Sequence, residues 1–270
     1  MYKNEHSINT YLHRIANILL INGGFLTNLG LYTGDMGIVL FFCRYARLTQ
    51  NDIYLEYSSY LFEKVKNNIQ PNTPLNYKQG LTGIGSAIEY LAQHEYLKID
   101  TDVILEEFDK RIFFTFNLSY LSIEKIADIG YYALWRIAGN SSLKSTIINS
   151  VIPQIVNTMT EWETRQNMTH PMVSLIKDII SSKNRIAQYY RSIILDWHQF
   201  CQEYYLDNLD AKPYMQLLEQ FTNNDSTMNN NFELGFQNGL VGLGLSLMSE
   251  LDGDNSWHSL FTNDLIPPEK

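Results

Sequence analysis

The sequence predicts an all-α protein made of about five helical hairpins whose inner helices converge at one end. Three observations lead to this prediction. A glycine motif that opens an apolar run occurs three times, beginning at Gly34, Gly80 and Gly239, with a spacing that fits two helices and two connections. Between the motifs, apolar residues recur at helical intervals. No segment shows the alternation of apolar and polar residues that is typical of a β-strand.

The first half of the chain is expected to contain five helices. Apolar spacing predicts the first over residues 6–21, and Asn22-Gly23-Gly24 ends it. Asn51-Asp52 and Asp100-Thr101 are typical helix caps, and they precede two further apolar stripes. Each of the first two glycine motifs opens the helix that follows it. The expected helices are therefore about 6–21, the first motif to about 48, about 52–69, the second motif to about 97, and about 101–116.

A weaker motif, the third in chain order, lies around Gly130, between the motifs at Gly80 and Gly239. If Gly130 corresponds to Gly85 of the second motif, then Lys125 and Asp128 take the places of Gly80 and Gly83. Further helices are expected at 142–162, where Pro153 should kink or split the segment. The remaining helical stretches before the last motif are predicted at 169–180 and 186–204.

The repeated glycines indicate close approach of the backbone. A glycine inside a helix costs about 1 kcal/mol relative to alanine, so several at helix starts need a structural reason. Inner helices that converge on one axis supply that reason. Convergence also gathers helix N-termini, with unpaired N–H groups, at one face, where we expect any functional site. The glycines assigned to repeat starts are Gly34, Gly37, Gly80, Gly83, Gly85, Gly130, Gly239, Gly242 and Gly244.

Composition excludes several classes of protein. The formal net charge is -9, and no cluster of Lys and Arg provides the basic patch that nucleic acid requires. No apolar stretch is long enough to span a membrane, and the polar N-terminus lacks the apolar core of a signal peptide. Only Cys43 and Cys201 occur, so no disulfide framework is expected. These features together predict a cytoplasmic protein.

The glycine motifs resemble those of the lanthionine synthetase C-like (lanthipeptide cyclase) family. The pattern Gly-x-x-Gly-x-Gly before an apolar helix is clearest at 80–91 and 239–248, and the motif at 34–42 is also good. The resemblance implies an α/α toroid, a ring of inner helices inside a ring of outer ones. We expect residues 1–270 to form one such domain, shortened from the family's seven hairpins. Its clear motifs lie at 30–48, 77–97 and 232–251, and a divergent region lies at 140–231.

The chain departs from the family at the zinc site. The resemblance implies one zinc ion held by a cysteine in a Gly-Trp-Cys motif and by a Cys-His pair in a Cys-His-Gly motif, and neither motif occurs here. Cys43 lies within an apolar run and Cys201 continues another, so both are expected to be core thiols. His170 is the histidine best placed to open an inner helix, but the six histidines show no metal-binding spacing. We therefore expect no metal and no other cofactor.

Carboxylates at the converging helix ends are the other candidate chemistry. Asp35 follows the first motif glycine and Asp128 lies in the third motif. Toroids of this kind also include carbohydrate-active enzymes, in which two carboxylates act as acid and base. The simpler reading is that an aspartate in the first turn of a helix is favoured by the helix dipole.

Two functions from different classes follow. The first is a zinc-free, cyclase-like toroid without catalytic activity, which binds a peptide or protein partner in a lanthipeptide-type modification system. The alternative is a divergent enzyme of the toroid class, either a cyclase-like peptide modifier or a hydrolase that uses Asp35 and Asp128. A scaffold that docks a larger enzyme is a third possibility. The sequence leaves the ligand and the oligomeric state open.

Overall fold

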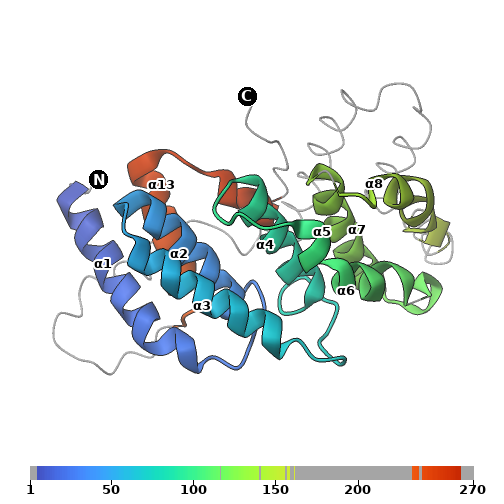
Figure 1. The fold of residues 1–270 in the computed structure, drawn as a ribbon, viewed down its shortest axis with the longest axis horizontal. Helices are drawn as coiled ribbons and strands as arrows, with labels where there is room; N and C mark the ends of the chain where they lie inside the picture. Colours follow the sequence, from blue (N-terminus) through green and yellow to red (C-terminus); the bar gives the residue numbers. More distant parts are fainter. Residues whose placement is uncertain are drawn as a thin grey trace. The chain divides into compact units, whose positions relative to one another are not determined.

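A computed structural model describes residues 5–115, 117–139, 141–155, 157–158, 161, 233–236 and 239–262. Every regular element in these ranges is a helix, and they contain no β-strand (Figure 1), which confirms the all-α prediction. The helices expected at 169–180 and 186–204 lie outside the described residues.

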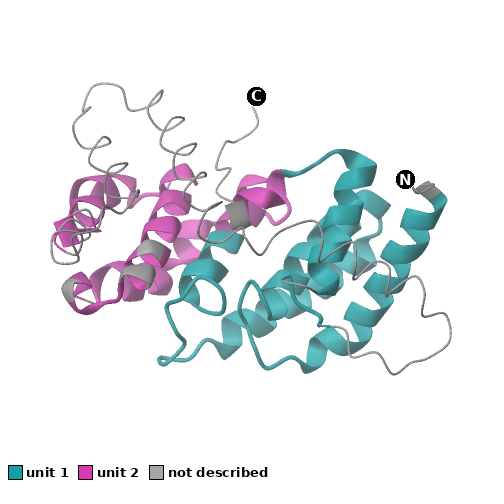
Figure 2. Cartoon of the chain, turned by 180° about the vertical axis from the view of Figure 1, so that it is seen from behind, with its two compact units in different colours: residues 1–87, 209–255 teal, residues 88–208, 256–270 magenta. Residues whose placement is uncertain are grey.

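The chain divides into two compact units, which are described separately below (Figure 2). Unit 1 comprises residues 1–87 and 209–255, and unit 2 comprises residues 88–208 and 256–270. Helix α4 (Leu81–Gln93) begins in unit 1 and ends in unit 2. The expectation that residues 1–270 form a single toroid domain stays a prediction.

Unit 1 is built around two helices that are buried almost all round. The first, α2 (Asp35–Thr49), has every residue from Asp35 to Ala46 buried, and α13 (Leu240–Asp252) is similarly enclosed. Around them pack α1 (Glu5–Asn22), which contacts α13, and α3 (Asp52–Asn68), which contacts α2 (Figure 1). Both surrounding helices are amphipathic, so each buries one face only. The helices that open with glycine are therefore the interior ones.

Several helix boundaries lie where the sequence predicts them. The side chain of Asn51 caps α3 by accepting a hydrogen bond from the Ile53 amide, and Asp100 caps α5 (Thr101–Ile104) in the same way. Gln50 ends α2 in the left-handed conformation, as Gly253 does after α13. Local capping chemistry therefore fixes these boundaries.

Unit 2 contains shorter and less regular helices. The single helix expected after Asp100 is broken at Leu105, whose backbone leaves the helical region. It continues as α6 (Glu106–Asp109) and the π-helical turn η2 (Lys110–Phe114). Its apolar residues Leu105, Phe108 and Ile112 are nevertheless buried, as the stripe predicts. The remaining elements are η3 (Leu118–Tyr120), α7 (Ile123–Ala138), α8 (Lys144–Thr146), η4 (Ile147–Val151), η5 (Ser256–His258) and α14 (Ser259–Thr262).

Candidate functional site

The three glycine motifs of unit 1 share one hydrogen-bond pattern. In each, the first two amides of the helix donate to carbonyls seven residues earlier, in the loop that precedes the helix. The expected unpaired N–H groups are therefore satisfied in part by the chain itself, because each loop folds back over its own helix start. The pairs are Asp35 to Asn28 (2.9 Å) and Met36 to Leu29 (3.2 Å), Leu81 to Pro74 (2.9 Å) and Thr82 to Leu75 (3.3 Å), and Leu240 to Glu233 (2.9 Å) and Val241 to Leu234 (3.2 Å).

Glycine is required where the loop crosses the helix start. A Cβ atom at Gly34 or Gly80 would overlap a carbonyl oxygen of the preceding loop, and one at Gly83 would overlap the Tyr77 carbonyl oxygen. At Gly37 the nearest oxygen, that of Leu31, would lie 2.5 Å away. These are backbone atoms that cannot rotate aside, so a side chain would displace the loop.

This crowding predicts a strong effect of Gly83→Ala. We expect the free energy of unfolding to fall by about 2–3 kcal/mol, because the methyl group must push the loop off the helix. The matched control is Gly24→Ala, where a Cβ would meet no atom within 4 Å; there we expect a change of no more than about 0.5 kcal/mol. Chemical denaturation of both variants measures the difference, and equal losses would contradict the crowding argument.

The main chain of Tyr32 joins the three loops. Its amide donates to the Lys78 carbonyl oxygen (2.9 Å), and its own carbonyl oxygen accepts from the Phe236 amide (2.6 Å). The rings of Tyr32 and Phe236 meet edge to face with centroids 5.9 Å apart. We call the joined loops, residues 28–34, 74–80 and 233–236 with Gly239, the glycine-loop platform. It is the candidate site in unit 1, because three segments far apart in sequence form it.

Asp35 departs from the pattern of the other loops. The same position holds Leu81 in the second motif and Leu240 in the third loop of the platform, whereas Asp35 places a carboxylate in the interior with no exposed surface. Lys64 of α3 lies with its Nζ 2.9 Å from Asp35 Oδ2. Burial raises the pKa of Asp35, although the hydrogen bond and the charge of Lys64 oppose that rise. Oδ1 has no hydrogen-bond donor among the described residues.

Lys64 also holds the start of the first loop. Its Nζ donates to the carbonyl oxygens of Gly24 (3.1 Å) and Leu26 (2.8 Å), on either side of the exposed Phe25. One ammonium group therefore connects η1 (Gly23–Phe25) with the first residue of α2. No motif in the sequence indicated Lys64. The one signal in the sequence for a buried cation here was Asp35 itself, because the other two loops have leucine at the corresponding position.

The motif around Gly130 differs in structure from the three motifs of unit 1. Helix α7 begins at Ile123, before Lys125, and the Ile126 amide donates to the Ser122 carbonyl oxygen as in an ordinary helix. Gly130 consequently lies in the helix interior, and Asp128 is a buried residue of the same helix. A lysine in place of the first motif glycine leaves no room for a loop to cross the helix start. Asp35 and Asp128 belong to different units, so their pairing stays a prediction.

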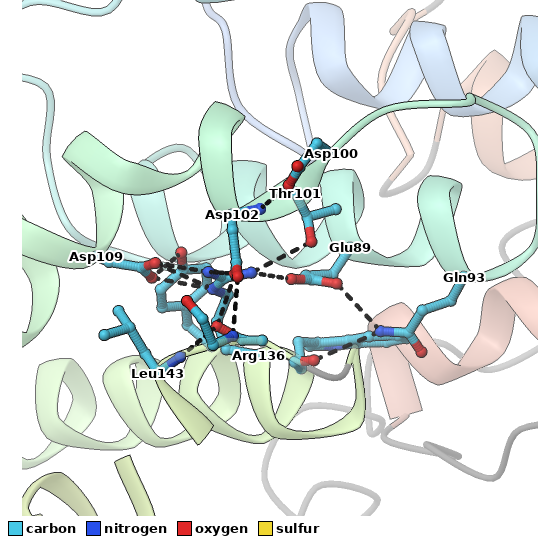
Figure 3. A network of polar contacts seen from close by, with 12 residues as sticks. Glu89, Gln93, Asp100, Thr101, Asp102, Asp109, Arg136 and Leu143 are labelled. Carbon is cyan, nitrogen blue, oxygen red and sulfur yellow. Dashed lines mark hydrogen bonds and ion pairs between the residues drawn. The ribbon is translucent and has the colours of Figure 1, made fainter. Parts of the chain in front are cut away.

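A buried ionic network occupies unit 2 (Figure 3). Arg136 of α7 contacts Asp109 (Nη2 to Oδ2, 2.7 Å), Asp102 (Nη2 to Oδ1, 2.7 Å) and Glu89, while Tyr132 donates to Asp109 (2.6 Å). The side chains of Arg136, Glu89 and Asp109 are at most 3% exposed. The network therefore connects α4, α5, α6 and α7, and we assign it a structural role.

The network contains three carboxylates and one guanidinium. Burial raises the pKa of Glu89 and of Asp109, against the opposing effect of Arg136. For Asp102, burial acts in the same direction, but hydrogen bonds from Ser142, Arg136 and Ser141 outweigh it and hold the pKa well below its usual value. Burial therefore makes the carboxyls of Glu89 and Asp109 retain their protons more readily than an exposed acid does.

The described residues do not fit the zinc site that the resemblance implies. Cys43 is buried, donates its S–H to Ser58 Oγ (3.4 Å), and has a pKa that burial raises to about 11. A zinc ligand must be a thiolate, which this environment disfavours. Within the described ranges, no group of three or more His, Cys, Asp or Glu residues is placed to hold a metal ion. His170 and Cys201 lie outside those ranges.

Comparison with models of protein families identifies a match. A family model described as lanthionine synthetase C-like protein matches residues 26–178, more than half of the chain. The match includes the first two glycine loops and all of α7. No curated protein and no solved structure matches the chain. Among the described helices, none combines the length and the apolar character needed to cross a membrane.

Proposed function

Because the chain belongs to the lanthionine synthetase C-like proteins, we propose that it is a zinc-free member that binds a peptide or protein partner. The partner belongs to a peptide-modification system of the lanthipeptide type. In this proposal the chain contributes recognition, and another protein performs the chemistry.

The observation that carries the proposal is the glycine-loop platform. Its three loops are joined through the main chain of Tyr32, so their backbone is fixed before any partner arrives. A preorganised surface loses little conformational entropy on binding. Thr33, Lys78 and Gln79 on this surface are exposed. Together they offer a hydroxyl, an ammonium and an amide, which suit the polar groups of a peptide.

The cysteines of this chain support the non-catalytic part of the proposal, because they do not match the zinc ligands of the family. In the family cyclases, zinc makes a cysteine thiolate available near neutral pH. Neither family zinc motif occurs in this sequence, and Cys43 is a buried thiol with a raised pKa. The alternative is an enzyme that uses Asp35 and Asp128. The burial of Asp35 beside Lys64 favours a structural role for that residue instead.

A synthetic peptide that contains one dehydroalanine and one cysteine tests the proposal. Binding is measured by fluorescence anisotropy, and hydrogen exchange maps the protected segments. Cyclisation would move the thiol hydrogen to the α-carbon as sulfur bonds the β-carbon, leaving the mass unchanged, so its readout is loss of the alkylatable thiol. We expect binding, protection of residues 28–34 and 74–80, and an intact thiol.

Three results would contradict the proposal. One is the absence of binding at concentrations where a weak peptide complex forms, about 1 mM. Another is binding accompanied by consumption of the thiol, which would make the chain a cyclase. Protection confined to α5 and α6 would move the site away from the platform and would also contradict the proposal.

A further inference from the structure

Lys78 differs from three other cations of unit 1, which form ion pairs. Lys64 pairs with Asp35, Lys66 with Glu63, and Arg44 with Asp252. Lys78 is exposed and forms no ion pair with any described residue. In a chain with a net charge of -9, a cation that forms no ion pair with the described residues is available for a carboxylate from another molecule.

The platform holds Lys78 in a defined place. Its carbonyl oxygen accepts the Tyr32 amide (2.9 Å), and its Nζ lies 5.7 Å from the centroid of the Tyr32 ring. An ammonium group over an aromatic face is attracted by the ring, which limits the rotamers of a long side chain. The amide of the next residue, Gln79, donates to Asn76 Oδ1 (2.7 Å) and fixes the loop. The cation is therefore presented from a rigid backbone.

The other exposed side chains of the platform do not compete for an anion. Thr33 and Gln79 are neutral, and the acidic Glu233 forms no ion pair with Lys78. An incoming carboxylate would find one cation on the joined loops, and Thr33 and Gln79 of the same loops carry a hydroxyl and an amide. A charged hydrogen bond of this kind contributes more to specificity than a neutral one.

We propose that Lys78 binds a carboxylate of the partner, so that the peptide recognised by this chain carries an acidic residue where it crosses the platform. This inference rests on the proposed function and names the chemistry of its ligand. It makes Lys78 a specificity-determining residue, since a peptide with a neutral side chain at that place loses the contact.

The test compares two versions of the dehydroalanine and cysteine peptide, one with a central glutamate and one with glutamine. Lys78→Gln is expected to weaken binding of the glutamate peptide about fivefold, the effect of a partly exposed ion pair, and to leave the glutamine peptide unchanged. Lys98→Gln, at an exposed lysine of unit 2, is the matched control and should change neither. The difference should shrink as salt is added.

A charge exchange makes the test specific. Lys78→Glu should reject the glutamate peptide and bind a third version with a central lysine, which wild type binds weakly. If wild type binds all versions equally, Lys78 is not the determinant and the inference is wrong, although the platform remains a peptide site. If wild type binds none of them, the proposed function fails as well.

Discussion

Arg136→Met is expected to lower the free energy of unfolding by about 3–5 kcal/mol, the usual loss when a buried ionic network loses one partner. The carboxylates of Glu89 and Asp109 would remain buried without a cation, with side chains 1% and 3% exposed. Asp102 is 34% exposed, so water can replace its partner, and it contributes little to the loss. Denaturant titration, followed by tryptophan fluorescence, measures the change.

The control is Lys110, which also contacts more than one carboxylate. Lys110 contacts Glu106 (3.0 Å) and Glu107 (2.8 Å), but all three side chains are more than half exposed. Lys110→Met should leave the denaturation midpoint unchanged. Arg136→Lys should fall between wild type and Arg136→Met, because one ammonium cannot reach all the acceptors that the guanidinium fork reaches. Equal midpoints for Arg136→Met and Lys110→Met would contradict the structural role.

Lys64→Met is expected to destabilise unit 1 by about 2–3 kcal/mol, somewhat below the full cost of breaking a buried pair. The variant leaves the Asp35 carboxylate buried without its cation, and the carbonyls of Gly24 and Leu26 without their donor. Because Lys64 is 20% exposed and Asp35 is 0% exposed, losing the lysine should cost more than losing the aspartate. Asp35→Leu alone should therefore be milder.

The double variant Asp35→Leu with Lys64→Met tests whether the ion pair itself explains the loss of stability. Leucine occupies the same position at Leu81 and Leu240, so an apolar pair at this place is compatible with the loop structure. We expect the double variant to recover most of the stability that Lys64→Met loses. A double variant as unstable as Lys64→Met would show that the ion pair does not explain the effect.

The parts of the fold that depend on local chemistry were predictable from sequence. Asn51 and Asp100 are caps that act within three residues, and both cap the helices they were expected to cap. The glycine motifs predicted interior helices with crowded starts. The repeated leucines Leu29, Leu75 and Leu234, each five residues before the motif glycine, were a further signal of the loop that folds back over the helix.

The contacts between distant segments were not predictable. Lys64 and Asp35 lie on different helices, and nothing local indicates that the two side chains meet. Arg136 lies between Trp135 and Ile137 in an apolar run, which predicts burial but does not identify Glu89, Asp102 and Asp109 as its partners. The third motif was expected to open a helix near Lys125, whereas α7 begins at Ile123, because without glycine no loop crosses its start.

We propose that this member of the lanthionine synthetase C-like proteins has glycine loops but no zinc chemistry. To test this, the purified protein is equilibrated with zinc and freed of unbound metal, and zinc per chain is determined together with thiol consumption in the dehydroalanine peptide. We expect zinc well below one ion per chain and an unchanged thiol. One tightly held zinc ion per chain, with loss of the thiol, would contradict the claim.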